Sequence, residues 1–178
     1  MIEYEYYNWN ALIDEKSREM YKHGIDEVIN AGAYWKNSPP YQTEMNVFKL
    51  PGEHWNNLKM SFIYSAFAFM KHDRPIKSIK SWGYKTNLET QEDRNTYWHQ
   101  HIRDNNLVVS GVYYVELPQN CNLETSGTEF AYPNPEGDVT MCPAKPGHWI
   151  IFPGKTWHRP GLLESNDWRY IVAADMEI

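Results

Sequence analysis

The feature that most constrains the fold is a change in hydrophobic pattern near Ile76. Before this residue apolar side chains recur at helical spacings, whereas after it short β-rich runs alternate with turn residues. The expected strands are residues 79–85, 96–101, 107–117, 128–132, 149–152 and 168–173. Proline, glycine and asparagine lie between them at a spacing typical of a jelly roll or small barrel. The sequence therefore predicts a mainly β protein, a double-stranded β-helix preceded by supporting helices.

Two helices are expected in residues 1–75. The first lies between Asp14 and Gly32, and the second begins at Pro51, in the position of an N1 proline, and ends near His72. The second carries apolar residues at three- and four-residue steps: Trp55, Leu58, Phe62, Ala66, Phe69 and Met70. Such a stripe is usually buried, so we expect it to cover one face of the sheet and assign it no chemistry.

Length and composition limit the class of protein. With 178 residues, 42% of them hydrophobic, the chain is expected to form a single domain over 1–178, with helical support in 1–75 and the β core in 76–178. The 17 basic and 23 acidic residues give a net charge of −6, which disfavours nucleic-acid or anionic-membrane partners. Two cysteines and no signal-peptide pattern predict a cytoplasmic protein. The pattern indicates no particular oligomeric state.

Histidines in the β half are the first candidates for chemistry. His99 and His101 flank Gln100 in a predicted strand, where alternation places residues i and i+2 on one face, about 6 to 7 Å apart. Both imidazoles can then reach one metal ion. A His-x-His pair alone is common by chance, so the interpretation depends on what else the chain supplies.

A third histidine and a buried arginine supply that support. His158 lies 59 residues after His99, directly after an apolar run and a Pro-Gly turn. Arg169 follows eleven residues later and opens the last apolar run. A charge in such a run needs a partner because an uncompensated buried charge is strongly disfavoured. The partner is therefore either a structural carboxylate or an anionic ligand.

Five segments together resemble a known family. They are Trp98-His-Gln-His101, Ser110-Gly-Val-Tyr-Tyr-Val-Glu116, Ser126-Gly-Thr-Glu-Phe130, Phe152-Pro-Gly-Lys-Thr-Trp-His158 and Arg169. In order and spacing they resemble the iron(II)- and 2-oxoglutarate-dependent dioxygenases, specifically the compact prolyl-hydroxylase-like branch and related oxygenases of bacteria and their viruses. Roughly the C-terminal 100 residues carry the resemblance.

The resemblance implies a set of site residues. His99 and His158 match the first and the distal iron-binding histidines, and Arg169 matches the residue that pairs with the far carboxylate of 2-oxoglutarate. Tyr114 resembles the tyrosine that contacts the same carboxylate. The implied cofactors are Fe(II), 2-oxoglutarate as cosubstrate and O2. The implied reaction is hydroxylation of a peptide or small-molecule substrate, with release of succinate and CO2.

One position departs from the family pattern. His101 stands where the superfamily normally has a carboxylate, so the usual two-histidine, one-carboxylate triad becomes three histidines. Asp104, close behind, and Glu129, after Gly127, are the alternative oxygen ligands. We expect His101 to be the third ligand. Arg159 is expected to face solvent, because alternation directs it away from the face of His158.

Two functions from other classes remain open at this point. A cupin-like three-histidine enzyme would use the same histidines without 2-oxoglutarate, but it has no need for Arg169 and Tyr114 at this spacing. A non-enzymatic jelly-roll module would bind glycans through exposed aromatic residues, which make up 15% of the chain. It predicts no metal, whereas both enzyme hypotheses predict three histidines that converge inside the barrel.

Overall fold

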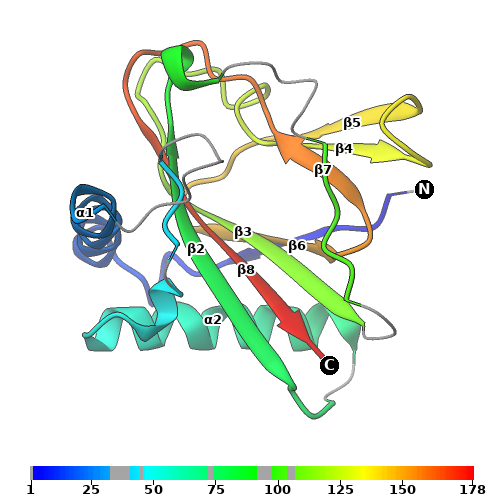
Figure 1. Cartoon of the computed structure of the whole chain (residues 1–178), viewed down its shortest axis with the longest axis horizontal. Helices are drawn as coiled ribbons and strands as arrows, with labels where there is room; N and C mark the ends of the chain where they lie inside the picture. The colour runs from blue at the N-terminus through cyan, green and yellow to red at the C-terminus, as the bar shows by residue number, and fades with distance from the viewer. Residues whose placement is uncertain (1, 33–40, 45, 72–73, 92–97, 104–106) are drawn as a thin grey trace.

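The computed structural model describes residues 2–32, 41–44, 46–71, 74–91, 98–103 and 107–178. In these residues two antiparallel sheets face each other and two helices cover the outer side of the larger sheet (Figure 1). The five-stranded sheet has the order β1 (Glu5–Asn8), β6 (His148–Pro153), β3 (Val108–Glu116), β8 (Arg169–Glu177), β2 (Ser78–Thr86). The three-stranded sheet has the order β5 (Asp138–Cys142), β4 (Thr128–Tyr132), β7 (Trp157–Pro160).

Both predicted helices form, close to their expected ends. Helix α1 (Glu15–Asn30) begins after Asp14, whose carboxylate accepts a hydrogen bond from the Ser17 amide at 2.8 Å. Helix α2 (Glu53–Met70) begins two residues after Pro51, because Gly52 at φ +120° is the N-cap. Among the described residues, neither helix combines the length and apolarity needed to cross a membrane.

The main hydrophobic core lies between the helices and the five-stranded sheet. Phe62 of α2 packs on Trp149 of β6 with ring centroids 5.0 Å apart, and the indole of Trp149 donates to Ser61 Oγ at 2.8 Å. The expectation that the aromatic stripe covers one sheet face is thus confirmed. Helices α1 and α2 meet at Gly24, where a Cβ would lie 2.8 Å from the Trp55 ring. Burial at this scale makes Phe62→Ala cost about 3 to 5 kcal/mol.

A second, smaller core fills the space between the two sheets. Strand alternation divides β3 between the cores, since Tyr113 faces the helices while Val112 and Tyr114 face inward. The inward residues include Phe130, Ile150 and Phe152. This inner core occupies one part of the space between the sheets, and side chains with functional groups line another part.

The predicted strands are largely confirmed, with two differences. Residues 98–101 do not form a full strand: His99 makes an isolated antiparallel bridge to His158, which extends the smaller sheet beyond β7, and residues 96 and 97 lie outside the described part. Strands β1, β5 and β7 were not expected as strands. Each has only four or five residues, and β5 is mostly exposed, so a local hydrophobic pattern is too short to reveal them.

Candidate metal centre

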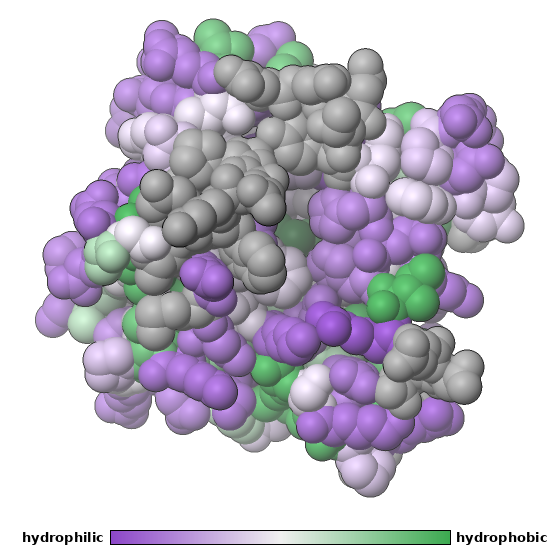
Figure 2. All heavy atoms as spheres, viewed as in Figure 1, coloured by the Kyte–Doolittle hydropathy of each residue, from purple (hydrophilic) through white to green (hydrophobic). Residues whose placement is uncertain are grey.

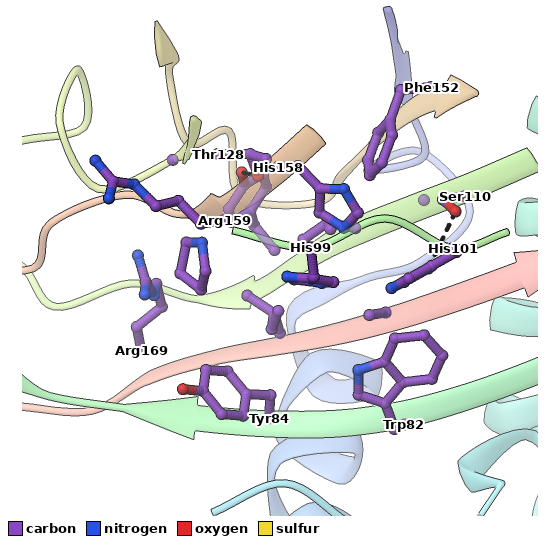
Figure 3. Close-up of a pocket in the computed structure, with 17 residues that line it drawn as sticks. Trp82, Tyr84, His99, His101, Ser110, Thr128, Phe152, His158, Arg159 and Arg169 are labelled. Atoms are coloured by element: carbon purple, nitrogen blue, oxygen red, sulfur yellow. Dashed lines mark hydrogen bonds between the residues drawn. The ribbon is translucent and has the colours of Figure 1, made fainter. Parts of the chain in front are cut away.

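Three histidines converge between the sheets. One donor atom from each of His99, His101 and His158 lies within 4.8 Å of the other two. The ring centroids are 4.2 Å apart for His99 and His158, 5.1 Å for His99 and His101, and 5.0 Å for His101 and His158 (Figure 3). The structure therefore brings together the three residues that the sequence singled out, and their spacing suits a single metal ion.

The hydrogen bonds of His158 favour the tautomer that binds a metal. Its Nδ1 lies 2.8 Å from the carbonyl oxygen of Thr156. A carbonyl only accepts, so Nδ1 carries the proton and Nε2 keeps its lone pair. Burial, followed by the proximity of His99 and His101, lowers the pKa of His158 well below its ordinary value. The ring is therefore neutral near pH 7, as a metal ligand must be.

His101 has a carboxylate partner that the sequence analysis missed. Asp175 Oδ1 lies 2.6 Å from His101 Nδ1 and accepts a hydrogen bond from Ser110 Oγ at 2.7 Å. Asp175 lies on β8 beyond the predicted end of that strand at residue 173. Two-residue alternation from Arg169 leads to Asp175 on the same face, so a longer strand would have revealed it.

The structure supports neither of the two alternative oxygen ligands that the sequence offered, Asp104 and Glu129. Asp104 lies outside the described residues. Glu129 forms an ion pair with Arg159, and it is not a member of the histidine group. The guanidinium of Arg159 also lies 4.3 Å from the Trp98 ring centroid, and its side chain is only 14% exposed. The expectation that Arg159 faces solvent is therefore wrong: it forms part of the cavity wall.

Arg169 and Tyr114 line the same cavity as the histidines. Arg169 is 2% exposed and donates to Thr86 Oγ1 at 3.2 Å, the Ser126 carbonyl at 2.6 Å and the Gly161 carbonyl at 3.0 Å. These three acceptors hold the guanidinium in a fixed position. Figure 3 shows Arg169 at one end of the cavity and His101 at the other. The cavity can therefore hold an anion on its arginine side and a cation on its histidine side.

Tyr114 supplies a protonated hydroxyl near this arginine. Its hydroxyl lies 2.7 Å from Thr128 Oγ1, and the side chain is 1% exposed. Burial raises the pKa of Tyr114, although the hydrogen bond with Thr128 and the charge of Arg169 oppose that shift. The phenol stays protonated at all physiological pH values, so it is able to donate a hydrogen bond to an anion.

Aromatic and aliphatic side chains form the rest of the wall. The Trp82 ring meets His101 edge-on at 5.4 Å, and Phe152 meets His158 edge-on at 4.7 Å. Ile171 and Val112 complete the lining on the sheet side. Apolar walls of this kind lower the local dielectric and strengthen interactions of the few polar groups inside.

Comparison with known proteins bears on the fold. No protein-family model matches the chain, and no curated protein matches its sequence. Solved structures do match. AviO1 from Streptomyces viridochromogenes Tue57 aligns with a TM-score of 0.70 and 12% identity, covering 99% of this chain and 90% of that chain.

Two further structures carry a chemical description. The non-heme alpha ketoglutarate dependent epimerase SnoN from nogalamycin biosynthesis aligns with a TM-score of 0.69 and 10% identity, covering 99% of this chain and 76% of that one. A Trichoplax adhaerens prolyl hydroxylase, solved with a peptide of hypoxia inducible factor, aligns with a TM-score of 0.59 and 14% identity, covering 98% of this chain and 83% of that one. The chain has the jelly-roll fold of the 2-oxoglutarate-dependent oxygenases. The predicted fold class and the resemblance to this superfamily are confirmed at the level of the fold.

Proposed function

We propose that this protein is an iron(II)- and 2-oxoglutarate-dependent dioxygenase that hydroxylates a small molecule or a peptide and releases succinate and CO2. One observation carries the proposal. The three-histidine cluster shares a single cavity with a buried arginine and a buried tyrosine, His99, His101 and His158 on one side and Arg169 and Tyr114 on the other. A cation site beside an anion site in one enclosed space suits a metal and a keto acid together.

The residues present fit iron(II). Imidazole nitrogens are ordinary ligands for this metal, and three on one side leave coordination positions open for other molecules. With 2-oxoglutarate and O2, bound iron would supply the oxidising power to break a substrate C–H bond. The chain's own task is to hold the three rings in place, which the backbone bridge between His99 and His158 and the apolar wall at Phe152 support.

Arg169 and Tyr114 would orient the cosubstrate. The guanidinium and the phenol are independent donors to one carboxylate, and charge-assisted bonds of this type are short and directional. The far carboxylate of 2-oxoglutarate would occupy this end, so that its keto-acid end points to the histidines. Because Arg169 is held by Thr86 and by two carbonyls, it needs little rearrangement to accept the anion.

A groove on the other side of His101 would receive the substrate. It has a volume of about 790 Å³, which is within the range of small-molecule sites. Trp82 and His101 line both this groove and the inner cavity. Figure 2 shows this face of the molecule hollowed near its centre, with hydrophobic atoms at depth beside hydrophilic residues.

The lining of the groove favours a polar substrate. Its polar residues include Gln42, Asn46, Ser81, Lys80 and Arg103. Both a functionalised small molecule and a short peptide segment meet this description. Among the similar structures, SnoN is described as an epimerase from nogalamycin biosynthesis, and the prolyl hydroxylase was solved with a bound peptide.

A three-histidine metal enzyme that does not use 2-oxoglutarate is the second candidate. The identity of His101 favours it, because a facial triad with a carboxylate is the usual site for 2-oxoglutarate chemistry. Arg169 and Tyr114 argue against it, since such an enzyme has no need for two buried anion donors in the metal cavity.

Conversion of 2-oxoglutarate to succinate tests the proposal. The protein is incubated aerobically with Fe(II), carbon-13-labelled 2-oxoglutarate and ascorbate, which returns the iron to Fe(II) when no substrate is present, and succinate is followed by NMR. We expect several equivalents of succinate, dependent on iron and O2, with none from His158→Ala and wild-type yield from His148→Ala, a histidine outside the cluster. No succinate from fully iron-loaded protein that binds 2-oxoglutarate would overturn the proposal.

A further inference from the structure

We propose that Asp175 is a positioning residue that completes the metal centre through His101. The usual site has a carboxylate that binds the metal directly. Here the carboxylate contacts a metal-binding histidine instead, so it orients that histidine and places its negative charge near the metal. This inference rests on the proposed function, because it takes the three histidines as the metal ligands.

The contacts of Asp175 are short and buried. Its Oδ1 lies 2.6 Å from His101 Nδ1 and 2.7 Å from Ser110 Oγ, while Ser110 Oγ lies 3.2 Å from the same imidazole nitrogen. The side chain of Asp175 is 9% exposed and that of His101 is 16% exposed. Ser110 and Asp175 face each other directly in the ladder between β3 and β8. The carboxylate is therefore held by a rigid sheet and has two donors on one oxygen.

The hydrogen bond selects one tautomer of His101. An ionised carboxylate only accepts, so the Nδ1 of a neutral imidazole carries the proton and Nε2 presents its lone pair. The carbonyl oxygen of Thr156, 2.8 Å from His158 Nδ1, selects the same tautomer in His158. Both rings are thus arranged to bind a metal through the far nitrogen. Carboxylate partners of this kind fix ring orientation and raise the basicity of the ligand.

The two partners differ in charge, and this difference gives Asp175 a further effect. A divalent metal on three neutral imidazoles keeps a charge of +2, whereas one on two histidines and a carboxylate carries +1. Asp175 is in contact with the third ligand, so the summed charge of the metal, its three neutral ligands and Asp175 is the same +1. His101 with Asp175 therefore stands in for the missing carboxylate in charge as well as in position.

Strand β8 links this carboxylate to the cosubstrate side. Arg169 and Asp175 lie on the same face of β8, six residues apart, so one strand carries the positive charge near Tyr114 and the negative charge near His101. Trp82 on the neighbouring strand β2 packs edge-on against His101 at 5.4 Å and limits rotation of the ring. The ring is therefore held from two sides.

Metal affinity measures this role without reference to catalysis. Co(II) and Fe(II) binding is titrated anaerobically against a chelator, with Co(II) absorption reporting the geometry, for wild type, Asp175→Asn, Ser110→Ala and the exposed control Asp167→Asn. We expect Asp175→Asn to weaken binding about 10- to 100-fold, as is typical when a partner of a metal ligand is removed. Ser110→Ala should weaken binding less, and Asp167→Asn should leave affinity and spectrum unchanged.

A second background separates the coupling to His101 from general damage. In His101→Asp the ligand has no ring N–H for Asp175 to accept, so the hydrogen bond that orients the ligand is absent. Adding Asp175→Asn to this variant should therefore change metal affinity much less than the same substitution does in wild type. A structural role for Asp175 predicts the same loss in both backgrounds.

The outcomes are distinct from those of the proposed function. Wild-type metal affinity in Asp175→Asn, or an equal loss in both backgrounds, would overturn the positioning role and leave the succinate assay untouched. Conversely, absence of succinate formation would contradict the proposed function while the coupling between Asp175 and His101 remained measurable with Co(II).

Discussion

His99 and His158 exchange two backbone hydrogen bonds, from His99 N to His158 O at 3.1 Å and from His158 N to His99 O at 3.0 Å. This bridge brings the two ring centroids to 4.2 Å from each other, although His158 follows His99 by 59 residues in the chain. The two ligands are consequently positioned by main-chain pairing, before any metal binds. Because the main chain makes this pairing, we expect a substitution of either histidine side chain to leave the bridge in place.

Removal of His158 is expected to abolish metal binding without unfolding the chain. His158→Ala should bind no Fe(II) or Co(II) by elemental analysis after gel filtration, since two remaining imidazoles form a weak site. The circular dichroism spectrum should stay that of wild type. His148→Ala, a change of the same size outside the cluster, should retain one metal ion per chain. Full stoichiometry in His158→Ala would contradict the ligand assignment.

Arg169 is expected to control cosubstrate affinity rather than metal affinity. Arg169→Gln should weaken 2-oxoglutarate binding to the Mn(II) protein by about 10- to 100-fold in calorimetry, because a charged hydrogen bond contributes about 1.5 to 3 kcal/mol. Metal binding should be unchanged. The exposed Arg74→Gln serves as the control. If Arg169→Gln loses metal as well and its melting temperature collapses, the arginine has a structural role only.

The apo-protein is expected to lose stability below pH 6.5 through His158. Above that pH the residue is neutral in both folded and unfolded chains, so it adds no pH dependence. Below it, the unfolded chain takes up a proton that the folded chain refuses, because burial lowers the pKa of His158. The free energy of unfolding should therefore fall by up to about 1.4 kcal/mol for each pH unit.

Urea unfolding of the apo-protein at pH 7 and pH 5.5 measures this effect. His158→Gln lacks the titrating group and keeps all the acidic residues that also titrate, so it should lose less stability than wild type over the same interval. An equal loss in both proteins would show that His158 takes up its proton normally in the folded state.

The two cysteines are expected to differ sharply in reactivity. Burial raises the pKa of the Cys142 thiol to about 11, whereas Cys121 is partly exposed. Since the thiolate is the reactive form, a disulfide reagent at pH 8 should modify one thiol in the native protein and two in denaturant. Cys121→Ser should remove the fast native reaction. Fast modification of Cys142 in that variant would mean that the inner core opens readily.

The sequence pattern predicted the fold well where the elements are long. Helix α2 has apolar residues at a helical period, and strands β2, β3 and β8 are nine-residue runs rich in apolar or aromatic residues, so their presence follows from local pattern. Strands β1 and β7 are short and pair with strands far along the chain, and β5 is a short, mostly exposed strand that pairs with β4. Their formation depends on neighbours in the sheet, which a local pattern does not contain.

The candidate site was predictable in its ligands and less so in its supporting contacts. His99, His101 and His158 were found from their spacing together with the family resemblance. Asp175 was missed because the strand was expected to end two residues earlier. Arg159 was misplaced because alternation gives only its face, whereas its contacts with Glu129 and Trp98 come from other segments.

An anaerobic titration of the apo-protein with Fe(II) and then with 2-oxoglutarate, followed by visible absorption, tests the metal centre and the use of 2-oxoglutarate together. Chelation of the metal by the keto acid would give a weak metal-to-ligand band. We expect this band for wild type, and we expect Arg169→Gln to need a much higher concentration of 2-oxoglutarate to produce it. Iron uptake without the band would contradict the use of 2-oxoglutarate and favour the three-histidine enzyme. Failure to bind iron at all would contradict the metal centre itself.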